Sequence, residues 1–354
     1  MTEGSAVDHL FSSLDLRGLE DALQGSDGWG NLQFGQIVEK LISGEYDISQ
    51  GLGQMIWQFF WGEWETNRKY LIYILLLTIA FSLLKNFAQV FEQSYISNVC
   101  FLLVYALLMV LLMKSVLLLD QVVQQTIAVV LDFMTAFVPV FATTVVVAGG
   151  DATAMGFYEL GFLVVYLVQW ILADGLVPLI RIYVVMGLLN YVMEEGRFSK
   201  LTDLLENMVS WALKILTSVV LGLNIIKNAI APVTDTFARQ TLRKSLAFVP
   251  GIGSTLSAAS DLFLAASDVI RSGIGAAALV VLVILIAVPL SKVGIMTFFY
   301  RVLAAFVEPV ADKRISNAIL VAAKGGGMLF RILTNCAILI FITVAMTTLI
   351  GGRN

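Results

Sequence analysis

Long apolar runs separated by short polar stretches make up most of this chain from residue 70 onward. A helix needs about 20 apolar residues to span the hydrocarbon of a bilayer, where only internally hydrogen-bonded backbone is tolerated. The runs that approach or exceed this length are 70–84, 95–113, 122–148, 157–192, 211–226, 275–290, 293–307 and 328–350. Because 157–192 is long enough to cross twice and other runs are short, the pattern predicts an all-α, polytopic membrane protein with six to eight crossings.

The first 65 residues differ from the rest, since they are rich in Asp and Glu and contain Arg17 and Lys40 as their basic side chains. We expect a short acidic arm outside the membrane (1–65), followed by a membrane domain (66–354). The arm ends in an aromatic cluster, residues 54–65, which predicts an interfacial helix because Trp prefers the headgroup level. Packing of this cluster within the arm is the alternative.

The stretch "FVPGIGSTLSAASDLFLAASDVIRSG", residues 248–273, lies between apolar runs but is rich in Gly, Ser and Ala. Its proline and glycines end any preceding helix, and a new helix can start near Ser254 or Thr255. On that helix one face carries small and charged residues, which can pack closely against a partner helix or line a wet path. The candidate residues in this stretch are Gly251, Gly253, Ser257, Asp261, Asp268 and Arg271. Two interpretations stay open, namely a helix lying at the interface with its charges in water and a re-entrant or pore-lining helix.

Three further charges, Asp132, Asp174 and Arg181, lie inside apolar runs. An unpaired charge there costs at least roughly 2.5 kcal/mol, so each needs a partner or water. Asp174 and Arg181 are two helical turns apart and can pair along one face if a kink at Pro178 brings them together. A structural ion pair and a transport role both explain this pattern.

Basic residues in short loops indicate which side of a membrane protein is cytoplasmic. The richest basic segments are "RQTLRKS" (239–245) and "DKR" (312–314), and we expect both to be cytoplasmic. An external arm agrees with that orientation only if one middle segment does not cross the membrane.

Composition excludes several classes of function. The chain is 58% hydrophobic and 14% charged, with a net charge of −4, so it offers no basic surface for nucleic acid. Its one histidine, His9, makes a catalytic triad or a His-based metal site improbable, and Cys100 and Cys336 lie in apolar runs. Gly325–Gly327 lack the spacing of a phosphate loop and are interpreted as a flexible entry to the last span. We therefore expect no enzyme activity and no cofactor.

The chain resembles the stage III sporulation protein AE family of endospore-forming bacteria. The similarity covers most of the sequence, and its most specific segments are "LDLRGLEDAL" in the arm, "FVPGIGSTLSAASD" and "LAAFVEPVADKRISN". The resemblance implies a membrane subunit of the channel-like complex that joins mother cell and forespore and supports late forespore development. A stand-alone small-solute permease and a purely structural membrane scaffold are the alternatives.

The resemblance also implies partners and a location. The partners are the other stage III sporulation A-type membrane proteins and, through the complex, stage II sporulation protein Q; lipid is a further partner, and a homo-oligomer is allowed. The expected location is the mother-cell membrane around the forespore. Family members usually begin with a secretory signal, whereas "MTEGSAVDHLFSS" has neither a basic start nor an apolar core. We expect an upstream start and an arm that lies between the two membranes.

Neutralising Asp261 and Asp268 tests the two interpretations of residues 248–273. If both carboxylates line a wet path, Asp261→Asn/Asp268→Asn should lower a late forespore reporter while leaving the abundance of the protein unchanged. If they face the headgroup layer, water already solvates them, and stability should change by no more than about 0.5 kcal/mol. Wild-type reporter activity in the double variant would reject the functional interpretation.

Overall fold

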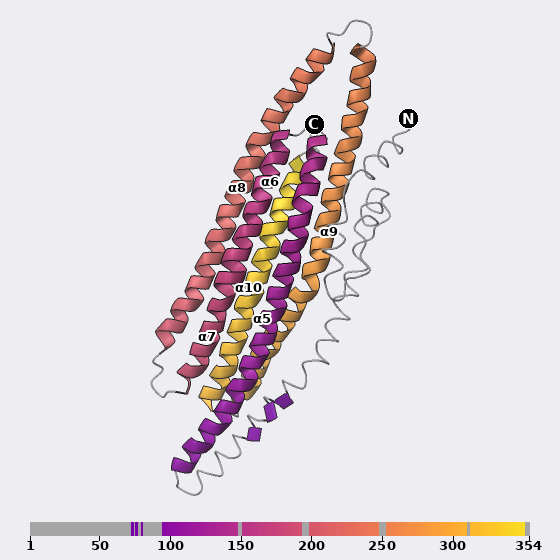
Figure 1. Ribbon diagram of the computed structural model, residues 1–354. Helices are drawn as coiled ribbons and strands as arrows, with labels where there is room; N and C mark the ends of the chain where they lie inside the picture. The colour runs from indigo at the N-terminus through magenta and orange to yellow at the C-terminus, as the bar shows by residue number, and fades with distance from the viewer. Residues whose placement is uncertain are drawn as a thin grey trace.

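The computed structural model consists of long helices that lie alongside one another in an elongated bundle (Figure 1). It describes residues 72–73, 75–76, 79–80, 94–147, 151–192, 198–247, 253–309 and 312–350. The elements are α5 (Ser94–Val147), α6 (Asp151–Leu167), the π-helix η1 (Val168–Leu176), α7 (Val177–Asn190), α8 (Ser199–Ala247), α9 (Gly253–Val307) and α10 (Lys313–Ile350). The predicted all-α fold is confirmed, and the predicted arm, 1–65, lies outside the described residues.

Five stretches of the described helices are long and apolar enough to cross a membrane. They are Leu102–Val146, Ala154–Asn190, Ser199–Lys227, Arg271–Val307 and Lys313–Met346. The chain is thus a multi-pass membrane protein. The six to eight crossings predicted for the whole chain include the run 70–84, most of which lies outside the described residues, so that number stays a prediction.

Helices α5 and α9 each join two apolar runs that the sequence pattern had separated. Helix α5 continues through Lys114, and α9 continues through Pro289 and Lys292. Lys114 is exposed on the surface of the bundle, where its flexible stem can carry the ammonium group away from apolar contacts. A proline is tolerated inside a membrane helix because neighbouring groups satisfy the freed backbone. The runs 95–113 and 122–148 are therefore joined in one helix, and so are the runs 275–290 and 293–307.

The continuity of α9 overturns the expected orientation of the basic loops. Segment 239–245 lies near the end of α8, and Lys313 begins α10, so the single helix α9 separates the two. Figure 1 places the end of α8 and the start of α10 at opposite ends of the bundle. Since α9 contains one candidate span, the two basic segments lie on opposite sides of the membrane when α9 crosses it. In that case only one of them can be cytoplasmic, which conflicts with the prediction that both are.

The run 157–192 is also one continuous helical stretch, with a change of helix type where a kink was expected. The π-helix η1 precedes Pro178, which occupies the first turn of α7 and has no N–H to donate. The N–H of Val177 instead reaches back five residues to the carbonyl of Leu172. Gly175 suits this wider turn, because a Cβ there would lie 3.3 Å from the carbonyl oxygen of Trp170.

Helix α10 occupies the centre of the bundle, where it contacts α5, α6, α7, α8 and α9. Its small residues permit this close approach: a Cβ on Gly325 would lie 2.5 Å from a methyl group of Val184 in α7, and one on Gly326 would lie 2.7 Å from Oγ1 of Thr297 in α9. These glycines lie in the interior of α10. The interpretation of Gly325–Gly327 as a flexible entry is therefore wrong, since all three lie inside α10 and Gly325 and Gly326 are sites of tight helix packing.

The close approach at Gly326 predicts a specific cost for a single methyl group. Gly326→Ala should lower stability by about 1–3 kcal/mol, because Thr297 and Leu119 already occupy the space around this position. Gly222→Ala on α8 is the matched control, since no atom lies within 4 Å of a Cβ built there. The measurement is the temperature at which the detergent-solubilised protein loses its monodisperse size-exclusion peak. Equal midpoints for the two variants would contradict the packing argument.

Candidate functional site

A buried carboxylate on α5, that of Asp120, forms a charged contact with Arg181 on α7. Oδ2 of Asp120 accepts hydrogen bonds from Nε of Arg181 at 2.9 Å and from Nη2 at 2.5 Å. The side chain of Asp120 is 3% exposed, whereas that of Arg181 is 38% exposed. Because an isolated charge is costly at this depth, the two groups stabilise each other as a nearly neutral unit.

The partner of Arg181 differs from the one that the sequence suggested. Asp174 lies in η1 on the exposed side of its helix, where Oδ1 accepts a hydrogen bond from Nε2 of Gln169 at 3.0 Å. The wider turn of η1 changes the angular relation between Asp174 and Arg181, which the prediction had taken from an α-helix with a kink. The structure therefore contradicts the proposed Asp174–Arg181 pair and replaces it with the Asp120–Arg181 pair.

The carboxylate of Asp120 is only half satisfied. Its Oδ1 is buried and has no hydrogen-bond partner among the described residues. A buried acceptor without a partner costs free energy, so this oxygen can accept a hydrogen bond from one further donor, such as a water molecule. The same interface contains a hydrogen bond from the hydroxyl of Tyr105 on α5 to the carbonyl of Leu188 on α7, at 2.5 Å.

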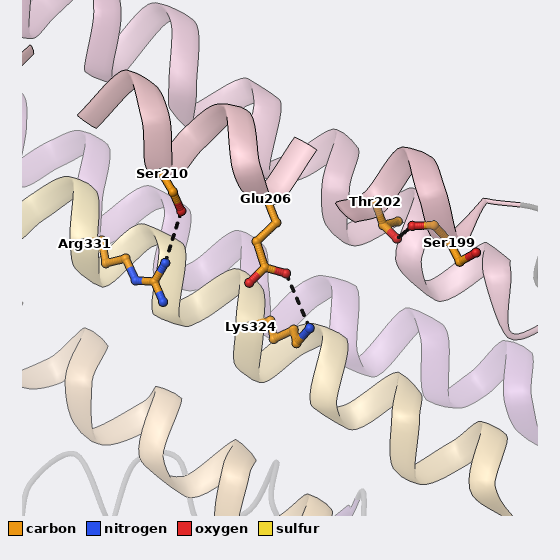
Figure 2. A network of polar contacts seen from close by, with 6 residues as sticks. All are labelled: Ser199, Thr202, Glu206, Ser210, Lys324 and Arg331. Atoms are coloured by element: carbon orange, nitrogen blue, oxygen red, sulfur yellow. Dashed lines mark hydrogen bonds and ion pairs between the residues drawn. The ribbon is translucent and has the colours of Figure 1, made fainter. Parts of the chain in front are cut away.

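A series of polar contacts, which we call the α8–α10 ladder, joins the central helix to α8. Its two charged rungs are the ion pair of Lys324 with Glu206 at 3.4 Å and the hydrogen bond from Arg331 to Ser210 at 3.4 Å, and Figure 2 shows both. Near the start of α8 in the same view, Oγ1 of Thr202 donates to the carbonyl of Ser199. The charged rungs lie on the partly exposed side of the helix pair.

The ladder continues into the interior with neutral side chains. Oγ1 of Thr217 donates to Oδ1 of Asn335 at 2.6 Å, and Nδ2 of Asn224 donates to Oγ1 of Thr343 at 3.4 Å. Asn224 and Thr343 are fully buried. Residue numbers increase together along both helices, so α8 and α10 run parallel, and the ladder extends over roughly 27 Å of α8 at 1.5 Å per residue. It fixes the register of the two helices.

Two further polar contacts connect the outer helices. Glu159 of α6 forms an ion pair with Lys227 of α8, and both side chains are more than a third exposed. The hydroxyl groups of Ser115 in α5 and Tyr300 in α9 form a buried hydrogen bond. Each of these contacts joins helices that are distant in sequence.

The candidate residues of the stretch 248–273 are brought onto one helix. Helix α9 begins at Gly253, within two residues of the predicted start, and its first part projects beyond the ends of α5 and α10 (Figure 1). Gly251 lies outside the described residues, as do the side chains of Ser257, Asp261 and Asp268. Arg271 is 3% exposed and engaged in a contact, so its guanidinium is not in open water. The interfacial and re-entrant interpretations of this stretch both stay predictions.

The third predicted intramembrane charge, Asp132, is exposed on α5. Sequence reasoning did not single out Asp120, because it falls in the polar interval between two predicted spans. It also missed the α8–α10 ladder, although Asn and Thr at helical spacings in both helices are a detectable signal.

In the described part of the chain, no group of three His, Cys, Asp or Glu side chains could hold a metal ion.

Comparison with known proteins agrees with the sequence resemblance. A family model described as stage III sporulation protein AE matches residues 32–351. The stage III sporulation protein AE of Bacillus subtilis (strain 168) is 24% identical over 322 residues, which cover 90% of this chain and 80% of that protein. No solved structure matches the chain significantly.

The unequal burial of the Asp120–Arg181 pair predicts unequal effects of removing each partner. Arg181→Met should destabilise the protein by about 3–5 kcal/mol, because it leaves a buried carboxylate unpaired. Asp120→Asn should cost less, since the guanidinium of Arg181 is 38% exposed and can reach polar surroundings. The double variant Asp120→Asn/Arg181→Met should be more stable than Arg181→Met alone.

Thermal midpoints of the detergent-solubilised wild type, both single variants and the double variant complete this cycle. If the double variant is no more stable than Arg181→Met, the stability lost in Arg181→Met does not come from breaking the Asp120–Arg181 pair.

Proposed function

The chain belongs to the stage III sporulation protein AE family, and on this premise we propose that it is a membrane subunit of the channel-like complex joining mother cell and forespore. The family match extends over residues 32–351, and five apolar helices form its membrane part. In this proposal the protein lies in the mother-cell membrane around the forespore and supports late forespore development. The single observation that carries the proposal is the family match along nearly the whole chain.

The proposed partners are the other stage III sporulation A-type membrane proteins and, through them, stage II sporulation protein Q. The outer faces of the described helices suit lipid and membrane partners, because large apolar side chains such as Met155, Trp211 and Phe306 are each more than 60% exposed. The projecting first part of α9, which carries Gly253, Ser257, Asp261 and Asp268, is a proposed contact for a partner or a wet path. No enzyme activity is proposed.

A stand-alone permease is the second candidate, and one observation favours it. The π-helix η1 interrupts the α6–α7 stretch close to the buried Asp120–Arg181 pair, and irregular helices beside intramembrane charges are common at transport sites. Against it, large side chains of α5 such as Phe133 and Phe137 are fully buried in the apolar core. The α8–α10 ladder is the one observation in favour of a scaffold role. It does not distinguish this role from the others, because such a ladder would stabilise a helix bundle of any function.

Copurification tests the proposal. The full chain, tagged at its own chromosomal locus in the source bacterium, should copurify from mildly solubilised sporulating membranes with the other stage III A-type proteins and with stage II sporulation protein Q. Deletion of its gene should lower late forespore reporters and leave reporters that act before engulfment unchanged. An untagged strain controls for nonspecific recovery.

Two other outcomes would contradict the proposal. Recovery of the chain without these partners, together with solute flux in liposomes that contain only this chain, would replace the complex subunit with the permease. Recovery without the partners and without flux would favour the scaffold.

A further inference from the structure

An apolar cavity lies between α9 and α10. Its volume is about 320 Å³, and nine side chains of the two helices line it, all of them apolar. Three of these, Val283, Ile338 and Phe341, are between 36% and 40% exposed, so the cavity opens at the surface of the bundle. A polar solute would find no hydrogen-bond partner among these side chains, and the cavity therefore suits a hydrocarbon chain.

Two arginines lie along the same side of α10 as this cavity. Arg331 and the cavity residue Ile338 are two helical turns apart, so they share one side of α10. Gly327 is one turn before Arg331 and faces α9, since a Cβ there would lie 3.4 Å from Nη2 of Arg301. Two guanidinium groups thus approach this side of α10, one from α10 itself and one from α9.

Neither arginine has a carboxylate partner in the described part of the chain. Arg331 donates one hydrogen bond, to Oγ of Ser210 at 3.4 Å (Figure 2), and a guanidinium has five N–H donors. Nearby Lys324, by contrast, is paired with Glu206. Because both arginines are exposed, their remaining donors are open to an anion from outside the bundle, and the guanidinium fork matches the oxygens of a phosphate.

The uncharged segments of α9 and α10 place Arg331 at the level of lipid headgroups. Residues 272–291 and 332–350 contain no charged side chain, and each approaches the length of about 20 residues that crosses the hydrocarbon. The two segments lie alongside each other, since Phe330 packs against Gly294. Arg331 directly precedes the α10 segment and therefore lies at the end of a hydrocarbon-length stretch, where basic side chains reach the headgroups.

The cavity is within reach of an acyl chain whose headgroup lies at Arg331. Ala337 and Ile342 are the first and last cavity residues of α10, and they lie roughly 9 and 17 Å beyond Arg331 at 1.5 Å per residue. One acyl chain extends from its headgroup through half of the hydrocarbon, about 15 Å. A molecule with a phosphate at one end and a hydrocarbon chain at the other therefore matches both the arginines and the cavity.

We propose that this groove, formed by Arg301, Arg331 and the apolar cavity, binds an anionic phospholipid. The phosphate accepts hydrogen bonds from the two guanidinium groups, and one acyl chain occupies the cavity between α9 and α10. The arginines select anionic over zwitterionic headgroups, and the cavity selects a lipid over free phosphate. This inference rests on the lipid contact of the proposed function and names the class of lipid and its site.

Lipid binding to the purified full chain tests the headgroup contact. The delipidated protein in detergent is titrated with phosphatidylglycerol, or with phosphatidylcholine of the same acyl chains, and native mass spectrometry gives an apparent Kd for each. The wild type should prefer phosphatidylglycerol, and Arg301→Gln and Arg331→Gln should each weaken its binding by about fivefold. Lys200→Gln removes an exposed lysine in the first turn of α8 and is the matched control, with no expected effect. Equal Kd values for Arg331→Gln and Lys200→Gln would overturn the headgroup contact.

A second pair of variants tests the cavity. Ala287→Phe places a ring among the cavity side chains and should weaken both lipids by about tenfold, because the loss of about two buried CH₂ groups is sufficient for that effect. Ala305→Phe, at an exposed position of the same helix, should weaken neither. A monodisperse size-exclusion peak shows that each variant is folded. Wild-type binding by folded Ala287→Phe would overturn the acyl-chain site.

Photocrosslinking distinguishes the lipid from other occupants of the cavity. A phosphatidylglycerol with a diazirine in its acyl chain should crosslink to segments 282–290 and 337–342, as read by peptide mass spectrometry. If another segment of the chain or a second copy fills the cavity, the crosslinks will lie elsewhere, and the proposal is overturned. All three assays use the purified chain alone, so their failure is distinguishable from failure of the proposed function, which is measured by copurification in the source bacterium.

Discussion

The close packing of α10 against every other described helix of the bundle is the constraint on which the rest of the structure depends. Inside a membrane there is no hydrophobic drive to bring apolar helices together, so van der Waals packing and interhelical hydrogen bonds must supply the attraction. Gly325 and Gly326 permit that contact toward α7 and α9. With α10 central, each outer helix has one side that faces the interior of the bundle. Its polar side chains therefore fall into two groups, those on this inward side and those on the outward side.

That sorting explains why polar groups in this protein fall into two classes. Between helices, several charged and amide groups meet a partner from a distant helix, as in the Asp120–Arg181 pair and the α8–α10 ladder. Such contacts add little net stability, because both partners lose their hydration. They favour the observed register, because any other register of the helices would leave these groups buried without a partner. On the outward side of α5, polar residues have no such role in the fold.

The sequence was sufficient for the fold class, the family and most of the apolar runs, because hydropathy over about 20 residues is a strong signal in a membrane protein. The sequence was insufficient at single residues that could either end a helix or lie within it. Lys114 and Lys292 resemble span boundaries in a hydropathy pattern, yet both lie within continuous helices. Likewise, the sequence Gly325–Gly327 on its own suggests flexibility. The close packing becomes apparent only from the positions of Val184 and Thr297 in neighbouring helices. The pairing of Arg181 with Asp120 crosses 61 residues of sequence, so no local spacing indicates it.

The continuity of α9 also limits how the chain can be oriented. Since the basic segments 239–245 and 312–314 lie at opposite ends of the bundle, the positive-inside rule can be satisfied by only one of them. If 312–314 is cytoplasmic, the start of α5 is on the cytoplasmic side too, because α5, α8 and α10 all begin at the same end of the bundle. One crossing by the run 70–84 would then place the acidic arm outside the cytoplasm. If the run 70–84 crosses once, an external arm thus requires the basic "DKR" segment, and not "RQTLRKS", to be the cytoplasmic one.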